Sequence, residues 1–273
     1  MAQKWYIIHI MNNYHSRDEN NYRKRWITPQ IKSAVGKFPV VVLTGARQVG
    51  KSTFLSHEFS DYKYVSLDDF GALQQAKSDP ASLWIDADHI IIDEAQKAPE
   101  IFPAIKLSID SSKKARQFIL SGSSNLLLMQ KISETLAGRA VYFEMFPMTY
   151  SEMNNISDSP QAFFELWEKN LTNKGASIKG IDSYALLLKG FMPPLLRLKE
   201  QKDILLWWEG YVRTYLERDV RELTQVESLI DFKKMLDSLA VRTGNVLNQS
   251  EVSRDSGVSQ PTVHRYIKLL EVS

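Results

Sequence analysis

Cysteine is absent from the 273-residue sequence, and this absence excludes several kinds of chemistry together. A chain without cysteine forms no disulfide, presents no thiolate to a metal ion and has no cysteine nucleophile. The same absence fits a reducing compartment. Long apolar runs are lacking too, since none approaches the ~20 residues of a membrane-spanning helix. The stretch 5–11 is too short for a secretory signal and has no small-residue cleavage site. We therefore expect a cytoplasmic protein.

An excess of one charge is also missing. The sequence has 34 lysine and arginine residues against 32 aspartate and glutamate residues, a formal net charge of +2. This balance indicates no general polyanion-binding surface, and it excludes neither nucleic acid nor acidic partners. Hydrophobic residues make up 44% of the sequence, which is ordinary for a globular chain. The length suits one large domain or two modest ones.

A glycine-rich loop at residues 45–52 is the most informative stretch. It reads Gly-Ala-Arg-Gln-Val-Gly-Lys-Ser, follows the apolar run 39–44 and precedes a helical pattern at 53–59. It matches G-x-x-x-x-G-K-[ST] in full, between a strand and a helix, where a phosphate-binding loop must lie. Glycines let the backbone wrap a phosphate with its N–H groups turned inward, and the following helix adds the positive end of its dipole. A chance glycine loop is the weaker alternative.

Two side chains of this loop have separate predicted roles. Lys51 supplies a mobile positive charge for the β- and γ-phosphates. Ser52 supplies a hydroxyl for Mg²⁺. The predicted phosphate-binding set is Gly45, Ala46, Arg47, Gln48, Val49, Gly50, Lys51, Ser52 and Thr53.

A second motif lies at 89–94, where His-Ile-Ile-Ile precedes Asp93 and Glu94. The continuous apolar run is typical of a strand buried on both faces of a parallel sheet, and acids at its C-terminal end point into the crevice where ligands bind. We expect Asp93 to hold the Mg²⁺ shell, usually through water, and Glu94 to polarise the attacking water as general base. Acids often follow strands, so the motif is weak alone and good evidence only after a complete phosphate loop.

The predicted strand 117–120 ends in Ser121, with Ser123 and Asn125 close behind. A hydroxyl at this place can lie between the acidic strand and the γ-phosphate, where it orients water and senses hydrolysis. Ser121 is therefore the predicted sensor, with the other two as second choices. The alternative is ordinary loop chemistry, because serine, glycine and asparagine are turn residues.

Arg139 immediately precedes a fifth predicted strand, 140–143. In ring-forming ATPases an arginine at this position reaches a neighbouring subunit's γ-phosphate, where its rigid fork neutralises transition-state charge. The equally weighted alternative is a surface arginine paired with acids.

Together these motifs resemble a widespread group of prokaryotic AAA+ ATPases. The resemblance rests on Thr44–Ser52, Ile92–Lys97, Leu120–Asn125 and Leu136–Arg139. It implies an α/β P-loop core with parallel sheet order 5-1-4-3-2, followed by an all-α lid and a winged helix-turn-helix. Members are usually described as ATP-binding proteins, and we expect ATP and Mg²⁺ as cofactors. A homo-oligomer would be the partner that the finger interpretation of Arg139 requires, since the arginine would complete a neighbour's site. Full-length members continue into a nuclease-like domain of unknown function, so we expect this sequence to be a fragment or a truncated gene product.

On this resemblance the chain divides into four predicted parts: a flexible lead-in at 1–21, the ATPase core at 22–148, the lid at 149–200, and a helical linker with the helix-turn-helix at 201–273. Related ATPases carry a Gly-x-Pro turn in the lid that touches the nucleotide. This sequence has an extra residue between the glycine and the proline, at Gly190 and Pro193. The resemblance is therefore only weak support for a nucleotide contact by these two residues. A plain helix-breaking turn is the alternative.

The last part has helix-turn-helix form. Asn248 is expected to cap a helix at 249–256, Gly257 to make the turn, and Ser259 to cap a second helix at 260–270. Acids in the unit offset its bases, so protein contacts are as well supported as DNA. Side chains on the second helix that suit phosphates and base edges are Gln260, Thr262, His264, Arg265 and Lys268.

The sequence therefore predicts Mg²⁺-dependent ATP hydrolysis by an AAA+ type ATPase, coupled to repositioning of its C-terminal module. The alternative is a nucleotide-gated DNA-binding regulator or toxin-antitoxin-like component with little or no turnover. A kinase is disfavoured, because the sequence has no acceptor-binding insertion and no second phosphate-binding signature.

Overall fold

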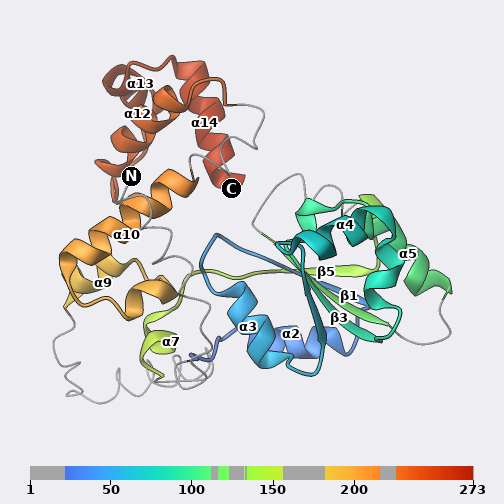
Figure 1. Ribbon diagram of the computed structural model, residues 1–273. Helices are drawn as coiled ribbons and strands as arrows, with labels where there is room; N and C mark the ends of the chain where they lie inside the picture. Colours follow the sequence, from blue (N-terminus) through green and yellow to red (C-terminus); the bar gives the residue numbers. More distant parts are fainter. Residues whose placement is uncertain are drawn as a thin grey trace, which may run out of the picture. The chain divides into compact units, whose positions relative to one another are not determined.

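The structure is a computed structural model that describes residues 22–111, 116–122, 132, 134–155, 182–215 and 226–272. These residues form two compact units, one ending at Lys199 and the other beginning at Glu200. Figure 1 shows the helices and strands of both. Across the described residues, no helix combines the length and the apolar character needed to cross a membrane.

A parallel sheet of five strands forms the centre of the first unit. Its order is β2-β3-β4-β1-β5, which is the predicted order 5-1-4-3-2 read from the other edge, so that prediction is confirmed. Every pairing is parallel, so the carboxyl ends of all strands meet at one edge, where ligands bind in open α/β sheets. The strands are β1 (Val40–Thr44), β2 (Lys63–Ser66), β3 (His89–Asp93), β4 (Gln117–Ser121) and β5 (Ala140–Glu144).

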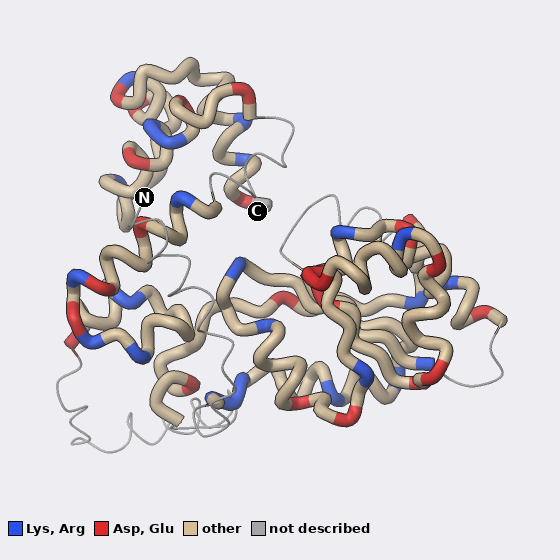
Figure 2. The backbone as a smooth tube through the Cα atoms, in the orientation of Figure 1, with Lys and Arg blue, Asp and Glu red and all other residues tan. Residues whose placement is uncertain are grey.

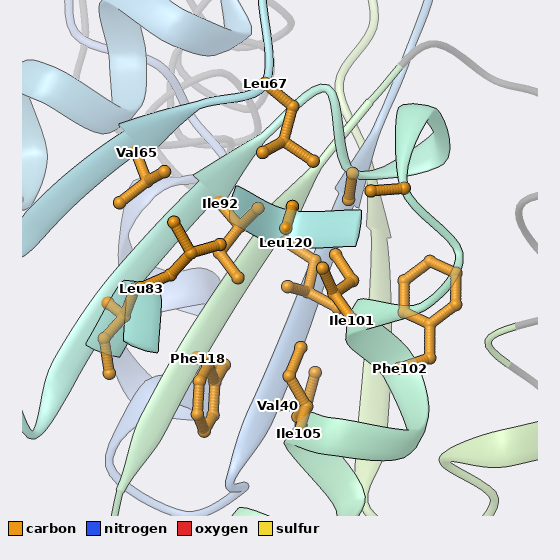
Figure 3. Packing of buried hydrophobic residues seen from close by; sticks show 14 of the residues in the cluster. Val40, Val65, Leu67, Leu83, Ile92, Ile101, Phe102, Ile105, Phe118 and Leu120 are labelled. Carbon is orange, nitrogen blue, oxygen red and sulfur yellow. The ribbon is translucent and has the colours of Figure 1, made fainter. Parts of the chain in front are cut away.

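The central strands β1, β3 and β4 are almost entirely buried, because helices cover both faces of the sheet. In Figure 1, α2 and α3 lie on one face and α4 and α5 on the other. Figure 3 shows the core beneath α5, where Phe118 and Leu120 of β4 and Ile92 of β3 lie close to Ile101 and Ile105. The edge strands β2 and β5 keep partly exposed positions. The remaining elements of this unit are α2 (Thr28–Val35), α3 (Lys51–Glu58), α4 (Phe70–Ser78), η3 (Pro80–Trp84), η4 (Ala95–Lys97), α5 (Ile101–Ser111), α7 (Tyr150–Asn154), α9 (Ser183–Lys189) and η5 (Pro193–Leu196).

One predicted helix boundary was wrong. Helix α3 begins at Lys51, ahead of the predicted start at 53, because Gly50 adopts the left-handed φ of 98° that turns the loop into the helix. Helix α4 is capped by Asp69, which directly precedes the helix and whose carboxylate accepts a 2.8 Å hydrogen bond from the Ala72 N–H.

The second unit is helical in its described part. It consists of α10 (Gln201–Thr214), α12 (Leu229–Ala240), α13 (Gln249–Ser256) and α14 (Gln260–Val272). Helices α12, α13 and α14 share one apolar core built on Phe232, Met235, Val252, Val263 and Tyr266.

The predicted pair of helices and its turn are present in this unit. Asn248 accepts hydrogen bonds from the Ser250 and Glu251 N–H groups, and Gly257 follows α13 with a φ of 69°. The Ser259 hydroxyl accepts a hydrogen bond from the Thr262 N–H at 3.4 Å. The two helices therefore begin where their caps predict. That they act as a helix-turn-helix module stays a prediction.

Packing of α12 is the first testable consequence. Phe232 is fully buried, while Ile230 on the same helix is 71% exposed. Phe232→Ala is expected to lower the free energy of unfolding by about 3–5 kcal/mol, because it leaves a cavity in the core. Ile230→Ala is the control, with an expected change within about 0.5 kcal/mol. Denaturant titration followed by circular dichroism measures both, and equal losses would contradict the described packing.

Candidate functional site

The loop motif 45–52 runs from the end of β1 into the first turn of α3, at the carboxyl edge of the sheet. Gly45 has a φ of 148°, and a Cβ added to it would lie 2.3 Å from the carbonyl oxygen of Met145. Only glycine fits there. Gln48 has a φ of 61°, which is uncommon for a residue with a side chain. The backbone is thus tightly wound, and the other predicted phosphate-contacting residues lie in the same turn or the first turn of α3: Ala46, Arg47, Val49, Gly50 and Thr53.

Lys51 lies across this loop. Its Nζ donates hydrogen bonds to the carbonyl oxygens of Gly45 at 2.8 Å and Ala46 at 3.0 Å, and the residue is only 8% exposed. A buried ammonium group needs such partners to offset its lost hydration. The predicted cation is therefore held inside the turn of the loop.

Asp93 is the acceptor on which the site converges. Its Oδ2 accepts hydrogen bonds from Ser52 Oγ at 2.8 Å and from Tyr64 Oη at 2.5 Å. Its Oδ1 accepts from Ser121 Oγ and from the Glu94 N–H at 3.1 Å. Asp93 is 4% exposed and Ser121 1% exposed. The structure thus brings together three predicted residues from the loop, β3 and β4.

Tyr64 was missed by the sequence analysis. It lies on β2, the neighbour of β3, two residues before Ser66, which pairs with Asp93. Burial and the adjacent Asp93 charge raise the pKa of its phenol, so the hydroxyl stays protonated and donates to Asp93. The alternating pattern of residues 62–67 predicted the strand. The contact between Tyr64 and Asp93 depends on which strand lies beside β3, and the sequence pattern of one strand does not predict its neighbour.

Glu94 follows Asp93 in a left-handed conformation, with a φ of 57° and a ψ of 40°. Its Oε2 accepts a 2.5 Å hydrogen bond from Gln96 Nε2. Burial raises the pKa of its carboxyl, and the charges of Asp93 and Asp68 raise it further, against the opposing Gln96 bond and Lys51 charge. A carboxylate with a raised pKa is a stronger proton acceptor, as a general base requires.

The oxygen donors at this edge suit Mg²⁺. The Ser52 hydroxyl and the Asp93 carboxylate are in direct contact, and magnesium favours one or two such protein oxygens together with water and phosphate oxygens. Clusters of three or more histidine, aspartate or glutamate residues, as a metal cage made wholly by protein would need, are not found in the described residues.

Arg139 is not part of this arrangement. It precedes β5 at the amino edge of the sheet, where its carbonyl accepts from the Val40 N–H, whereas the loop follows Thr44 at the opposite edge. A strand rises about 3.3 Å per residue, so β1 separates the two edges by roughly 13 Å. Arg139 instead donates to both carboxylate oxygens of Asp110, at 2.8 and 2.9 Å. Its predicted role on a neighbouring subunit stays a prediction, and the surface-pair interpretation stands beside it.

The predicted lid turn lies against the loop. Gly190 ends α9 with a φ of 56°, and Pro193 begins η5. A Cβ added to Gly50 would lie 3.7 Å from Cγ of Pro193. The Phe191 carbonyl accepts a 2.9 Å hydrogen bond from the Met148 N–H, which holds the turn to the segment after β5. Ser123 and Asn125, the second-choice sensors, lie outside the described residues.

The candidate DNA-contacting side chains on α14 largely have partners within their own unit. Arg265 pairs with Glu227 at 2.9 Å and Lys268 with Glu271 at 2.8 Å. His264 is 3.2 Å from Gln249, and the Thr262 and Ser259 hydroxyls are 2.8 Å apart. Figure 2 shows acidic and basic residues interspersed over these helices. Exposed pairs of this kind are weak and open readily.

Comparisons with known proteins agree with this architecture. Residues 37–154 match a family described as an AAA domain, and residues 181–273 match a domain of unknown function, DUF8612. Among solved structures, the Walker-type ATPase of Pyrococcus abyssi is 16% identical with a TM-score of 0.53, covering 93% of this chain and 97% of that one. This likeness shows the fold. Residues 37–154 are thus similar to an AAA domain, and the chain shares its fold with that Walker-type ATPase.

The curated relatives are uncharacterized proteins. Those of Mycobacterium tuberculosis and Mycobacterium bovis are each 26% identical over 249 residues, covering 90% of this chain and 51% of theirs. One from Haemophilus influenzae is 22% identical over 261 residues, covering 85% of this chain and 60% of its own. The chain therefore spans about half the length of the first curated relatives it matches.

The close approach of Gly45 to Met145 gives a stability prediction. Gly45→Ala forces a methyl group onto a backbone carbonyl at a φ that side chains resist, so we expect a loss of about 1–3 kcal/mol. Gly36→Ala is the matched control, because a Cβ there meets nothing within 4 Å and the φ is −72°. Thermal unfolding compares the two, and a Gly45→Ala midpoint equal to that of the control would contradict the described loop.

Proposed function

We propose that this chain binds ATP with Mg²⁺ at the loop 45–52 and hydrolyses it as an AAA+ type ATPase. The observation that carries the proposal is the convergence on Asp93 of Ser52 from the loop and Ser121 from β4, beside Glu94. A phosphate loop alone fits many phosphate-binding proteins. The hydrogen bond from the Ser52 hydroxyl to Asp93, the acid at the end of β3, fits a metal-dependent phosphoanhydride hydrolase.

The residues divide the work as follows. Backbone N–H groups of the loop hold the phosphates, and Lys51 leaves the carbonyls of Gly45 and Ala46 to bind the β- and γ-phosphates. Ser52 and Asp93 hold Mg²⁺, which neutralises charge on the phosphate oxygens when bound.

In the chemical step Glu94 takes a proton from water as the water oxygen forms a bond to the γ-phosphorus. The bond to the β–γ bridging oxygen breaks, and ADP and inorganic phosphate result. Gln96 holds the Glu94 carboxylate in place, and the raised pKa of that carboxyl strengthens it as a base. Ser121, which contacts Asp93, reports the phosphate state to β4.

The C-terminal unit is the proposed receiver of this signal. Its α14 presents Gln260, Thr262, Arg265 and Lys268, of which the two bases are held by exposed acids. DNA or a protein surface would have to compete with those acids. Steady turnover distinguishes an ATPase that drives this unit from a nucleotide-gated regulator, which holds ATP and releases little phosphate.

Phosphate release tests the proposed chemistry. Glu94→Gln is expected to lower kcat by about 10²–10⁴-fold while ATP stays bound, because only the proton acceptor is lost. Lys51→Ala is expected to lose ATP binding. Glu100→Gln, at an exposed glutamate nearby, is the matched control with an unchanged rate. If the wild type binds ATP but releases phosphate no faster than Lys51→Ala, the chain is a nucleotide-gated regulator and the hydrolase proposal is wrong.

Mixing variants tests the predicted role of Arg139 on a neighbour. Arg139→Ala is expected to keep ATP binding and lose turnover by about 10³-fold or more, as for other arginine fingers. Mixed with Glu94→Gln, it should regain part of the activity, because some interfaces then join an intact Glu94 to a neighbour's intact Arg139. Full activity of Arg139→Ala alone would exclude the role on a neighbour, and the pair with Asp110 would then be the remaining interpretation of Arg139.

A further inference from the structure

A buried ion pair lies beside the phosphate loop and was not singled out in the sequence analysis. Arg25 is 5% exposed and Glu152, on α7, is 4% exposed. Nε of Arg25 lies 3.3 Å from Oε1 of Glu152, off the direction of a hydrogen bond. Burying two charges is costly unless further hydrogen bonds satisfy them. The other contacts of each residue therefore decide what the pair does.

The guanidinium group of Arg25 joins two separate segments. Its Nη1 donates a 2.8 Å hydrogen bond to the carbonyl of Val49, inside the phosphate loop. Its Nη2 donates a 2.5 Å hydrogen bond to the carbonyl of Phe146, between β5 and α7. The planar fork of arginine presents donors at fixed angles, which a lysine ammonium group does not.

The contact with Val49 fixes the orientation of one peptide group. The Val49 carbonyl and the Gly50 N–H belong to the same trans peptide unit and point in opposite directions. Because Arg25 holds the carbonyl, the N–H is turned away from Arg25. In phosphate loops the inward N–H groups are those that bind the anion.

Glu152 holds Arg25 in place from α7. Its Oε1 accepts a 2.6 Å hydrogen bond from the Trp26 N–H, next to Arg25. Its Oε2 accepts a 2.7 Å hydrogen bond from the Thr149 N–H, and Thr149 Oγ1 accepts from the Glu152 N–H, so the carboxylate also completes the capping box of α7. Hydrogen bonds to Glu152 therefore join the start of α7 to the chain around Arg25.

Gly50 lies next to two residues from outside the loop, Arg25 and Pro193. A Cβ added to it would lie 3.8 Å from Nη1 of Arg25 and 3.7 Å from Cγ of Pro193. Its φ of 98° is one that side chains rarely adopt. The Val49–Gly50 peptide thus has Arg25 and Pro193 as neighbours from outside the loop, and Arg25 donates a hydrogen bond to its carbonyl.

We propose that Arg25 is a positioning residue for the phosphate loop, which turns the Gly50 N–H toward bound phosphate and is itself held by Glu152. The inference rests on the proposed function, because the phosphate is that of the bound nucleotide. It assigns to the segment before α2 and to α7 a direct influence on nucleotide affinity. A displacement of α7 would weaken phosphate binding by the loop, because Glu152 would no longer hold Arg25 in place.

Arg25→Lys tests the proposal while keeping a positive charge beside Glu152. One ammonium group does not reproduce the fork to Val49 and Phe146, so we expect the Kd for ADP to rise by about tenfold, the cost of a weakened hydrogen bond to a charged group. Arg23→Lys makes the same change at a partly exposed position two residues earlier and is expected to keep the wild-type Kd.

A spectroscopic measurement separates positioning from a general loss of structure. Only Gly36 and Gly50 follow a valine, so ¹³C-carbonyl valine with ¹⁵N-glycine labelling selects these two amide signals. In the wild type, addition of ADP and Mg²⁺ should move the Gly50 proton downfield as it hydrogen bonds to phosphate, with the Gly36 signal unchanged. In Arg25→Lys at saturating ADP, the Gly50 displacement should be smaller and the Gly36 signal should match the wild type.

The outcomes are distinct. If wild-type protein binds no ADP, the proposed function fails. If the wild type binds and Arg25→Lys matches it in both Kd and Gly50 displacement, Arg25 positions nothing and the inference is wrong. Should Arg25→Lys not fold, Glu152→Gln replaces it, since the fork stays and its anchor is weakened. A wild-type Kd and Gly50 displacement in Glu152→Gln would then overturn the proposal.

Discussion

The hydrogen bonds that Asp93 accepts are the constraint on which the site depends. They join the loop through Ser52, β2 through Tyr64 and β4 through Ser121 at one buried carboxylate. An ionised carboxyl group inside a protein is stabilised by such donors, and each donor is oriented in return. The same contacts that satisfy Asp93 therefore set the geometry of the loop hydroxyl relative to the acidic strand.

The parallel sheet makes this convergence possible. Because β3 and β4 are neighbours and point the same way, Asp93 and Ser121 end at one edge, although the chain makes a long crossover between them. The loop joins them because β1 pairs with β4 on the other side. Arg139, which precedes β5, lies at the opposite edge for the same reason. Strand direction alone thus separates Ser52, Asp93 and Ser121, which lie together at one edge, from Arg139 at the other.

The sequence predicted those parts of the site that depend on local pattern. The loop motif and the apolar run before Asp93 are continuous segments whose spacing reflects their chemistry, and the structure joins them through Ser52. The sheet order followed from the resemblance to AAA+ ATPases and was confirmed, whereas periodicity alone does not define it. Tyr64 was missed because its contact depends on strand pairing. Arg25 was missed because it lies in a basic stretch that resembles solvated surface, and its partners Val49, Phe146 and Glu152 are distant in the chain.

Everything proposed for this chain requires a nucleoside triphosphate held by Lys51 and Ser52 with its terminal phosphate toward Asp93 and Glu94. Equilibrium dialysis of the intact protein against labelled ATP at millimolar concentration, with and without Mg²⁺, measures this most directly. The account predicts one ATP retained per chain, more tightly with Mg²⁺ than without it. No retained ATP in either condition would contradict it.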